Sequence, residues 1–106
     1  MLVYFRDKLR QCGKTSFSKR ELSQILSVYG ARVQSGVWKD YAIDSLPEMA
    51  MFSIFRSSKE QPLYTVVKIS SRSMIKPSQY AVYSGKQPLK QSSSLREVLE
   101  FLKEQT

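Results

Sequence analysis

The sequence has 106 residues, of which 42% are hydrophobic and 25% charged, with four glycines and four prolines. A chain of this size and composition is expected to fold as one globular domain, which excludes a two-domain, fibrous or intrinsically disordered protein. It has no histidine and a single cysteine, so a histidine-dependent catalytic triad, an internal disulfide and structural zinc are excluded, and we expect no cofactor and no metal.

Lysine and arginine outnumber aspartate and glutamate by seventeen to nine, which gives a net charge of +8 and an isoelectric point near 9.8. The positive charge concentrates in residues 1–20 and 61–96, and the second range contains no acidic residue. A small, strongly basic protein typically binds an anionic partner; nucleic acid is the leading candidate, and an acidic protein is the next. The alternative is a solvated surface whose charge serves solubility alone.

No apolar run reaches the roughly 18 to 20 residues that a membrane-spanning helix needs, and the N-terminus lacks the long apolar stretch of a signal peptide. We therefore expect a cytoplasmic protein without a membrane partner. Residues 1–16 show no sustained periodicity and are predicted to be a basic N-terminal arm. The single domain is then expected to span residues 17–106.

The first strong local pattern begins at residue 17. Ser18 and Glu21 have the spacing of a capping box, and Phe17 has staple spacing with the first residue of the apolar stripe that follows. These patterns predict a helix that ends at Gly36. Gly30 lowers helix stability by about 1 kcal/mol relative to alanine, which suggests a close backbone contact there. The stripe consists of Leu22, Ile25, Leu26, Tyr29 and Val33.

After Trp38 the hydrophobic period changes toward 2. Four segments rich in β-branched and aromatic residues follow, namely DYAID, AMFSIFR, LYTVVKIS and QYAVYS, and a short fifth strand is expected near Leu89. Their connections are too short for crossover helices. Ser94 and Glu97 form a second capping box before a C-terminal helix. The sequence thus predicts an α+β fold: an antiparallel four- to five-stranded meander with an N-terminal and a C-terminal helix.

Alternation divides the predicted sheet into two faces. One apolar set is expected to form the core beneath the helices: Ala50, Phe52, Ile54, Leu63, Val67 and Ile69. The opposite set is both aromatic and basic: Met51, Phe55, Tyr64, Val66, Lys68 and, in one register, Tyr83. A face of this kind is covered by the chain itself or by a second copy, or it binds a ligand or nucleic acid.

Candidate binding residues cluster around the start of the sheet. A tryptophan beside lysine and tyrosine can stack on a base or ligand, although at a helix-to-strand junction it is more often a core anchor. Asp40 and Asp44 share one strand face with Ala42, where paired carboxylates serve acid–base chemistry or, more commonly, ion pairs. No residue is singled out as catalytic. The candidate binding residues are Arg20, Trp38, Lys39, Asp40, Tyr41, Asp44, Phe55, Arg56, Tyr64 and Lys68.

The chain between Phe17 and Lys68 also carries a family resemblance. Its most specific part is the segment GVWKDYAID at positions 36–44, followed by FSIFR at 52–56 and EQPLY at 60–64. These residues resemble a family of small alphaproteobacterial proteins catalogued only as a domain of unknown function, with a W-R/K-D-Y-A-I-D core. The resemblance implies a bacterial cytosolic protein and supplies no activity, cofactor or catalytic residue.

Three functional hypotheses follow from the sequence. The first is a non-enzymatic binding or regulatory module for an anionic partner, nucleic acid above all, or for another protein. The second is a homodimeric structural or interaction protein. The third is a small-molecule binder or enzyme that uses the segment from Trp38 to Asp44 together with Arg56.

Overall fold

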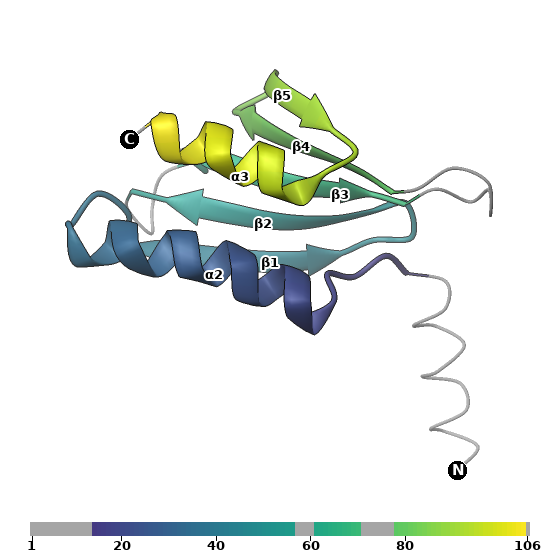
Figure 1. The fold of residues 1–106 in the computed structure, drawn as a ribbon, viewed down its shortest axis with the longest axis horizontal. Helices are drawn as coiled ribbons and strands as arrows, with labels where there is room; N and C mark the ends of the chain where they lie inside the picture. Colours follow the sequence, from purple (N-terminus) through teal and green to yellow (C-terminus); the bar gives the residue numbers. More distant parts are fainter. Residues whose placement is uncertain (1–13, 57–60, 71–77, 106) are drawn as a thin grey trace, which may run out of the picture.

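The computed structural model describes residues 14–56, 61–70 and 78–105 (Figure 1). In chain order they form helix α2 (Lys19–Gln34), strands β1 (Asp40–Ser45), β2 (Met49–Phe55), β3 (Tyr64–Ile69), β4 (Gln79–Ser84) and β5 (Gln87–Ser92), and helix α3 (Leu95–Glu104). Each strand pairs antiparallel with its sequence neighbour in one five-stranded sheet. The predicted α+β meander with a helix at each end is confirmed.

The predicted N-terminal arm lies mostly outside the described residues, which begin at Lys14. Thr15 ties the entering chain to the turn between β1 and β2, because its backbone N–H donates to Leu46 O at 2.8 Å and its hydroxyl donates to Pro47 O at 3.1 Å. Within residues 14–56, 61–70 and 78–105, neither helix combines the length and hydropathy that a bilayer crossing requires.

Helix α2 begins and ends as the sequence predicts. The backbone N–H of Glu21 donates to Ser18 Oγ at 3.1 Å, and the Ser18 N–H donates to Glu21 Oε1 at 2.7 Å, which completes the capping box. At the other end, Gly36 adopts a φ of 80° and its N–H donates to Val33 O at 2.9 Å. The close contact expected at Gly30 is wrong, because no described atom lies within 4 Å of the place where a Cβ would stand.

Both helices lie on one side of the sheet (Figure 1). Helix α2 runs along the β1 and β2 side, and α3 packs toward β4 and β5. The helices also meet each other, with Arg32 Nη2 donating to Lys103 O at 2.8 Å. The core fills the layer between helices and sheet, and its buried side chains include Ile25, Trp38, Phe52, Ile54, Val66, Val82, Val98 and Leu102.

The predicted division of the sheet into faces is wrong at β3. Phe52 pairs with Val66, so β3 contributes Tyr64, Val66 and Lys68 to the helix side. The residues predicted for the core, Val67 and Ile69, lie on the side without helices. Counting the alternation from Leu63 assigns the wrong face to every residue of β3, because Leu63 precedes the strand, which begins at Tyr64. The Leu63 N–H donates to Ile54 O at 2.7 Å. A shift of one residue exchanges the two faces of a strand.

The cap of α3 differs in one respect from the predicted capping box. Ser94 Oγ accepts from the Glu97 N–H at 3.5 Å, as expected. The Glu97 carboxylate, however, accepts from the Ser92 hydroxyl at 2.6 Å, and that hydroxyl oxygen accepts the Ser94 N–H at 3.0 Å. In a capping box the Glu97 carboxylate would accept the Ser94 N–H directly, whereas here the Ser92 hydroxyl lies between these two groups.

Candidate docking surfaces

The side of the sheet that faces away from the helices is mainly apolar; we call it the open face. Cross-strand partners share a face, so the register assigns to it Met49, Met51, Ser53 and Phe55 of β2, Thr65, Val67 and Ile69 of β3, and Gln79, Ala81 and Tyr83 of β4. Ser53, Val67 and Ala81 are buried, and the others are half-buried. In Figure 1 no described helix crosses this side. An apolar sheet face without its own cover typically marks an interaction site.

A hollow of about 350 Å³ runs along the open face. Met49 and Ile69 line it at one end, and Gly85 and Lys86 line it at the other. Lys86 is the one cation among its described lining residues. The hollow is therefore apolar along its length, with a single positive charge at its margin.

A second apolar surface follows the outer border of β1; we call it the β1 border. Among described residues, the large hydrophobic side chains with substantial exposure gather here, on α2, the turn after it and the β1 hairpin: Leu26, Val33, Val37, Tyr41, Ile43 and Leu46. Tyr29 of the same α2 stripe contacts Tyr41 edge to face, with ring centroids 5.0 Å apart. This contact turns the stripe toward β1, so the helix and strand residues form one strip.

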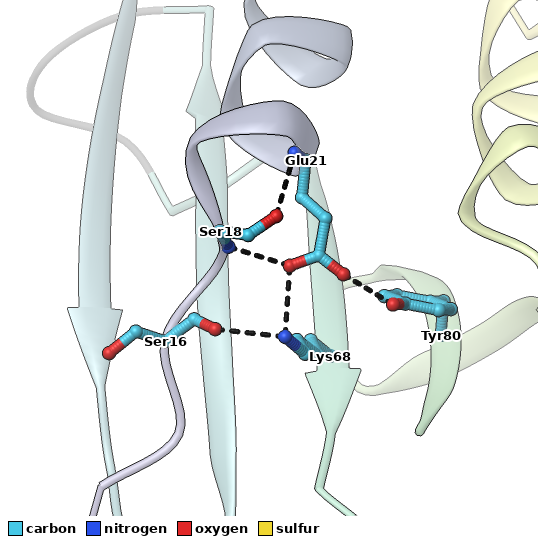
Figure 2. Close-up of polar contacts among 5 residues, drawn as sticks. All are labelled: Ser16, Ser18, Glu21, Lys68 and Tyr80. Atoms are coloured by element: carbon cyan, nitrogen blue, oxygen red, sulfur yellow. Dashed lines mark hydrogen bonds and ion pairs between the residues drawn. The ribbon is translucent and has the colours of Figure 1, made fainter. Parts of the chain in front are cut away.

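A polar cluster closes the end of the helix side where α2 begins (Figure 2). Lys68 Nζ on β3 lies 2.9 Å from Glu21 Oε1 and also donates to Ser16 O at 3.0 Å. The Tyr80 hydroxyl on β4 donates to Glu21 Oε2. The side chains of Lys68 and Glu21 are only 17% and 14% exposed, so Glu21 neutralises a largely buried cation.

The cluster shifts the pKa values of two of its members. Burial alone raises the pKa of Glu21, but hydrogen bonds from Tyr80, the Ser18 backbone and Lys68, together with the charge of Lys68, bring it below its usual value. Burial and the hydrogen bond to the Glu21 carboxylate raise the pKa of Tyr80 to about 12. Glu21 is thus held ionised and Tyr80 neutral, as a structural contact requires.

The predicted candidate residues in β1 and just before it lie in two environments, the core and the exposed surface. Trp38 is 1% exposed and stacks near Tyr29 with centroids 6.0 Å apart, so it is a core anchor. Its indole Nε1 has no hydrogen-bond partner among the described residues. Lys39, Asp40 and Asp44 are exposed. The prediction that the two aspartates share a face with Ala42 is confirmed, since all three lie at the β1 margin of the open face.

The other candidate residues do not form the shared aromatic and basic face that the sequence suggests. Tyr64 and Lys68 lie on the helix side, whereas Phe55 lies on the open face. Arg20 on α2 and Arg56 after β2 are exposed. The structure therefore separates Phe55 from Tyr64 and Lys68.

Sequence reasoning found part of the open face, since it places Met51, Phe55 and Tyr83 opposite the core, but it missed the other apolar residues of the two surfaces. Val67 and Ile69 were assigned to the core, and Leu26, Val33 and Ile43 were not considered as surface residues. A signal for the β1 border was present, because Tyr41 and Ile43 alternate with Asp40 and Asp44 in a strand that has one apolar and one acidic side.

The remaining large hollows lie on the helix side, one beside α3 and the others between α2 and α3. None of these hollows is lined by Trp38, Asp40, Tyr41 or Asp44. Across the described stretches of the chain, no three aspartate, glutamate or cysteine side chains gather as a metal site would require.

Comparison with known proteins places the chain in a family. No curated protein and no solved structure matches it. The family model described as "Protein of unknown function (DUF2794)" matches residues 15–99, which include both helix starts and the whole sheet. The match supports the resemblance to a domain of unknown function, while the alphaproteobacterial origin stays an expectation. The chain belongs to the DUF2794 family of proteins of unknown function.

Proposed function

We propose that the chain is a non-enzymatic interaction module that docks with a second copy of itself through the open face. The observation that carries the proposal is the mainly apolar surface of β2, β3 and β4 on the side without helices, which Ser53, Thr65 and Gln79 interrupt. A sheet that is apolar on both faces needs cover on both, and two such faces pack well when stacked about 10 Å apart.

The charges at the two margins of the open face support a second copy as the partner. Because the meander reverses at each turn, Asp40 at the start of β1 and Lys86 in the β4–β5 turn lie at the same end of the sheet, on opposite margins. A two-fold axis parallel to the strands stacks β1 of one copy over β5 of the other. That arrangement brings Asp40 over Lys86 of the other copy twice, and it buries the apolar centre between them.

Sedimentation equilibrium over a range of protein concentrations tests the proposal. The unaltered chain should form a dimer, and Met51→Lys should return it to a monomer because it places a charge at the centre of the apolar contact. Gln105→Lys adds the same charge at an exposed site next to α3 and should leave the dimer intact. A chain that stays monomeric at the highest concentration would contradict the proposal.

A charge exchange separates this contact from other modes of association. Asp40→Lys and Lys86→Asp alone should each weaken the dimer, because each places like charges opposite one another. The double variant should restore it. Equal dimerisation by all four proteins would exclude the stacked arrangement.

Nucleic-acid binding is a second candidate, favoured by the net charge of +8 and by exposed cations such as Arg20, Lys39 and Arg56. Binding to a single-stranded RNA should weaken with salt by a log–log slope of about 0.7 per phosphate contact. Met51→Lys should not weaken this binding, because the open face carries few cations. Affinity that is unchanged at about 0.5 M salt would contradict this candidate.

A further inference from the structure

Strand β1 is an edge of the sheet, because the strand order begins with it. Leu46 N donates to Met49 O at 2.8 Å in the hairpin, and the antiparallel register then directs the backbone groups of Asp44 and Ala42 toward β2. The backbone groups of Ile43, between them, point outward along the edge. The contacts of the entering chain at Thr15 lie beyond the strand, so no described segment pairs with the outer edge of β1, opposite β2.

The opposite edge of the sheet carries the features that prevent strand pairing. Strand β5 contains Pro88 and Lys90, and Leu89 is an extra residue that shifts its register against β4 between Val82 and Tyr83. Proline, lysine and a bulge are the devices by which natural proteins protect an edge. Strand β1 has none of them, since its six residues DYAIDS pair with β2 without a register shift.

The outer side of β1 offers two chemically different rows. On the helix side, Tyr41 and Ile43 are 41% and 44% exposed, and the exposed Leu26 and Val33 of α2 extend this apolar row. On the other side of the strand, Asp40 and Asp44 are exposed and flank Ala42. These two carboxylates form a local negative surface on a protein whose net charge is +8, so this side of β1 attracts cations although the chain as a whole is basic.

We infer that β1 binds an extended segment of another protein by strand addition, and that the segment alternates apolar and cationic side chains over about six residues. The Tyr41 N–H already donates to Asp40 Oδ1 at 2.8 Å, so the backbone of the segment bonds to the outward groups of Ile43. Its apolar side chains lie against Tyr41, Ile43 and Leu26, and its cations face Asp40 and Asp44. In strand addition the main chain supplies affinity and the alternate side chains supply specificity.

The charges favour this occupant over the two obvious alternatives. Pairing β1 with β1 of a second copy, with both helix layers on the same side, crowds Asp40 and Asp44 against the same two residues of the other chain. Nucleic acid would meet the same two carboxylates. The inference also differs from the proposed stacking of open faces, since that stacking leaves the backbone edge of β1 free, although both arrangements engage Asp40.

Binding of short peptides to the full chain, measured by fluorescence anisotropy, tests the inference. The first peptide alternates three valines and three lysines, the second has the same composition with the lysines in one block, and the third alternates valine and glutamate. The first should bind, and the other two should bind at least about tenfold more weakly because they lose the match of one row.

Two variants locate the binding. Ile43→Pro removes an outward N–H and leaves the bonds to β2 in place, and it should weaken the first peptide about tenfold. Asp44→Lys should weaken the valine–lysine peptide and strengthen the valine–glutamate peptide, which a loss of folding cannot do. Tyr83→Lys lies on the open face but on β4, three strands away from β1, so it is the control and should not weaken the first peptide.

The inference is overturned by equal binding of the alternating and block peptides, or by an unchanged peptide preference in Asp44→Lys. Dimerisation that Ile43→Pro abolishes and Met51→Lys does not would also overturn it, because the occupant would then be a second copy. Far-UV circular dichroism and the emission of the single, buried Trp38 establish that each variant is folded.

Discussion

Glu21 joins the start of α2 to the sheet beneath it. Its carboxylate closes the capping box with the Ser18 N–H and, at the same time, accepts from Lys68 and from Tyr80. One side chain therefore satisfies a helix terminus, a half-buried cation and a half-buried hydroxyl. The pKa of Glu21 falls below its usual value and that of Tyr80 rises to about 12 because each prefers the state in which these contacts form.

The lowered pKa of Glu21 predicts a loss of stability in acid. A carboxyl whose pKa is lower in the folded than in the unfolded chain stabilises the fold above its ordinary value of 4.5, and this stabilisation disappears as the pH falls below that value. Glu21→Gln should reduce the free energy of unfolding at neutral pH by on the order of 2 kcal/mol and flatten its dependence on pH in this range. Urea titrations at several pH values measure this.

Glu100→Gln is the matched control for Glu21→Gln. Glu100 pairs with Lys103 at 3.3 Å, but the side chains of this pair are 60% and 48% exposed, so the pair contributes little. The control should keep the acid dependence of the unaltered protein. If the free energy of unfolding depends on pH in the same way in Glu21→Gln as in this control, the cluster does not stabilise the fold.

The raised pKa of Tyr80 predicts a loss of stability in alkali. Its neutral form is favoured in the fold, so this stabilisation is complete below pH 10 and falls as the pH rises from 10 toward about 12. Tyr80→Phe should lack this alkaline decrease. Absorbance titration of the tyrosines in the folded protein should also lose its most alkaline step in the variant, and retention of that step would assign it to another tyrosine.

Two glycines of the first helical segment should respond oppositely to alanine. Gly30 is exposed inside α2 with open space around it, so Gly30→Ala should raise the free energy of unfolding by about 0.5 to 1 kcal/mol. Gly36 has a φ of 80°, so Gly36→Ala should lower it by about 1 kcal/mol. Thermal unfolding compares the two, and a decrease in both would mean that Gly30 has a contact after all.

At the scale of the elements, the start of α3 depends on a residue outside the helix. The Ser92 hydroxyl at the end of β5 connects the Ser94 N–H with the Glu97 carboxylate and so holds strand and helix in one arrangement. Helix termini need such partners because their first backbone N–H groups have none within the helix.

Ser92→Ala should therefore destabilise the protein by about 1 kcal/mol, the usual effect of losing a cap. Ser93→Ala, one residue along and exposed, should change the stability by much less. Chemical denaturation of both variants measures the difference. An equal effect of the two substitutions would show that the Ser92 hydroxyl adds nothing to the cap that Ser94 provides.

The elements differ in how far the sequence determines them. The limits of α2 could be predicted because Ser18, Glu21 and Gly36 act through neighbours in sequence. The faces of β3 could not, because Val66 and Val67 are both apolar and alternation alone does not say which side the helices cover. Alternation predicts that Lys68 lies on the face away from the core, and its actual place beneath α2 depends on Glu21, which is 47 positions away.

The surface at β1 was likewise predictable only in its local part. The shared face of Asp40 and Asp44 follows from alternation within one strand, and the structure has it. The exposed strip along β1 depends on which side of α2 faces the sheet, and that is a tertiary contact between Tyr29 and Tyr41. The sequence therefore indicated the acidic row but not the apolar row beside it.

At the scale of the whole molecule, both helices and the sheet share one core. Leu102 in α3 and Trp38 near β1 belong to the same buried cluster although they come from opposite parts of the chain. A single domain of this size is expected to unfold in one cooperative step.

Leu102→Ala should lower the free energy of unfolding by about 2 to 5 kcal/mol, because Leu102 is 1% exposed. The emission of Trp38 and the far-UV circular dichroism should report the same, lowered midpoint, even though the substitution lies in the other helix. Two separate midpoints would show that α3 and the sheet unfold independently.

The bond between Arg32 and the carbonyl of Lys103 spans 71 positions and joins the first described helix to the last. During synthesis α3 leaves the ribosome after the five strands, so this bond and the four buried side chains of α3 become available only after the sheet residues have been made. Until then, β4 and β5 lack the helix that covers them, and the nascent meander exposes apolar surface on both sides. The chain is therefore most prone to aggregate during this interval of translation, and a chaperone that binds exposed apolar strands would protect it most at that stage.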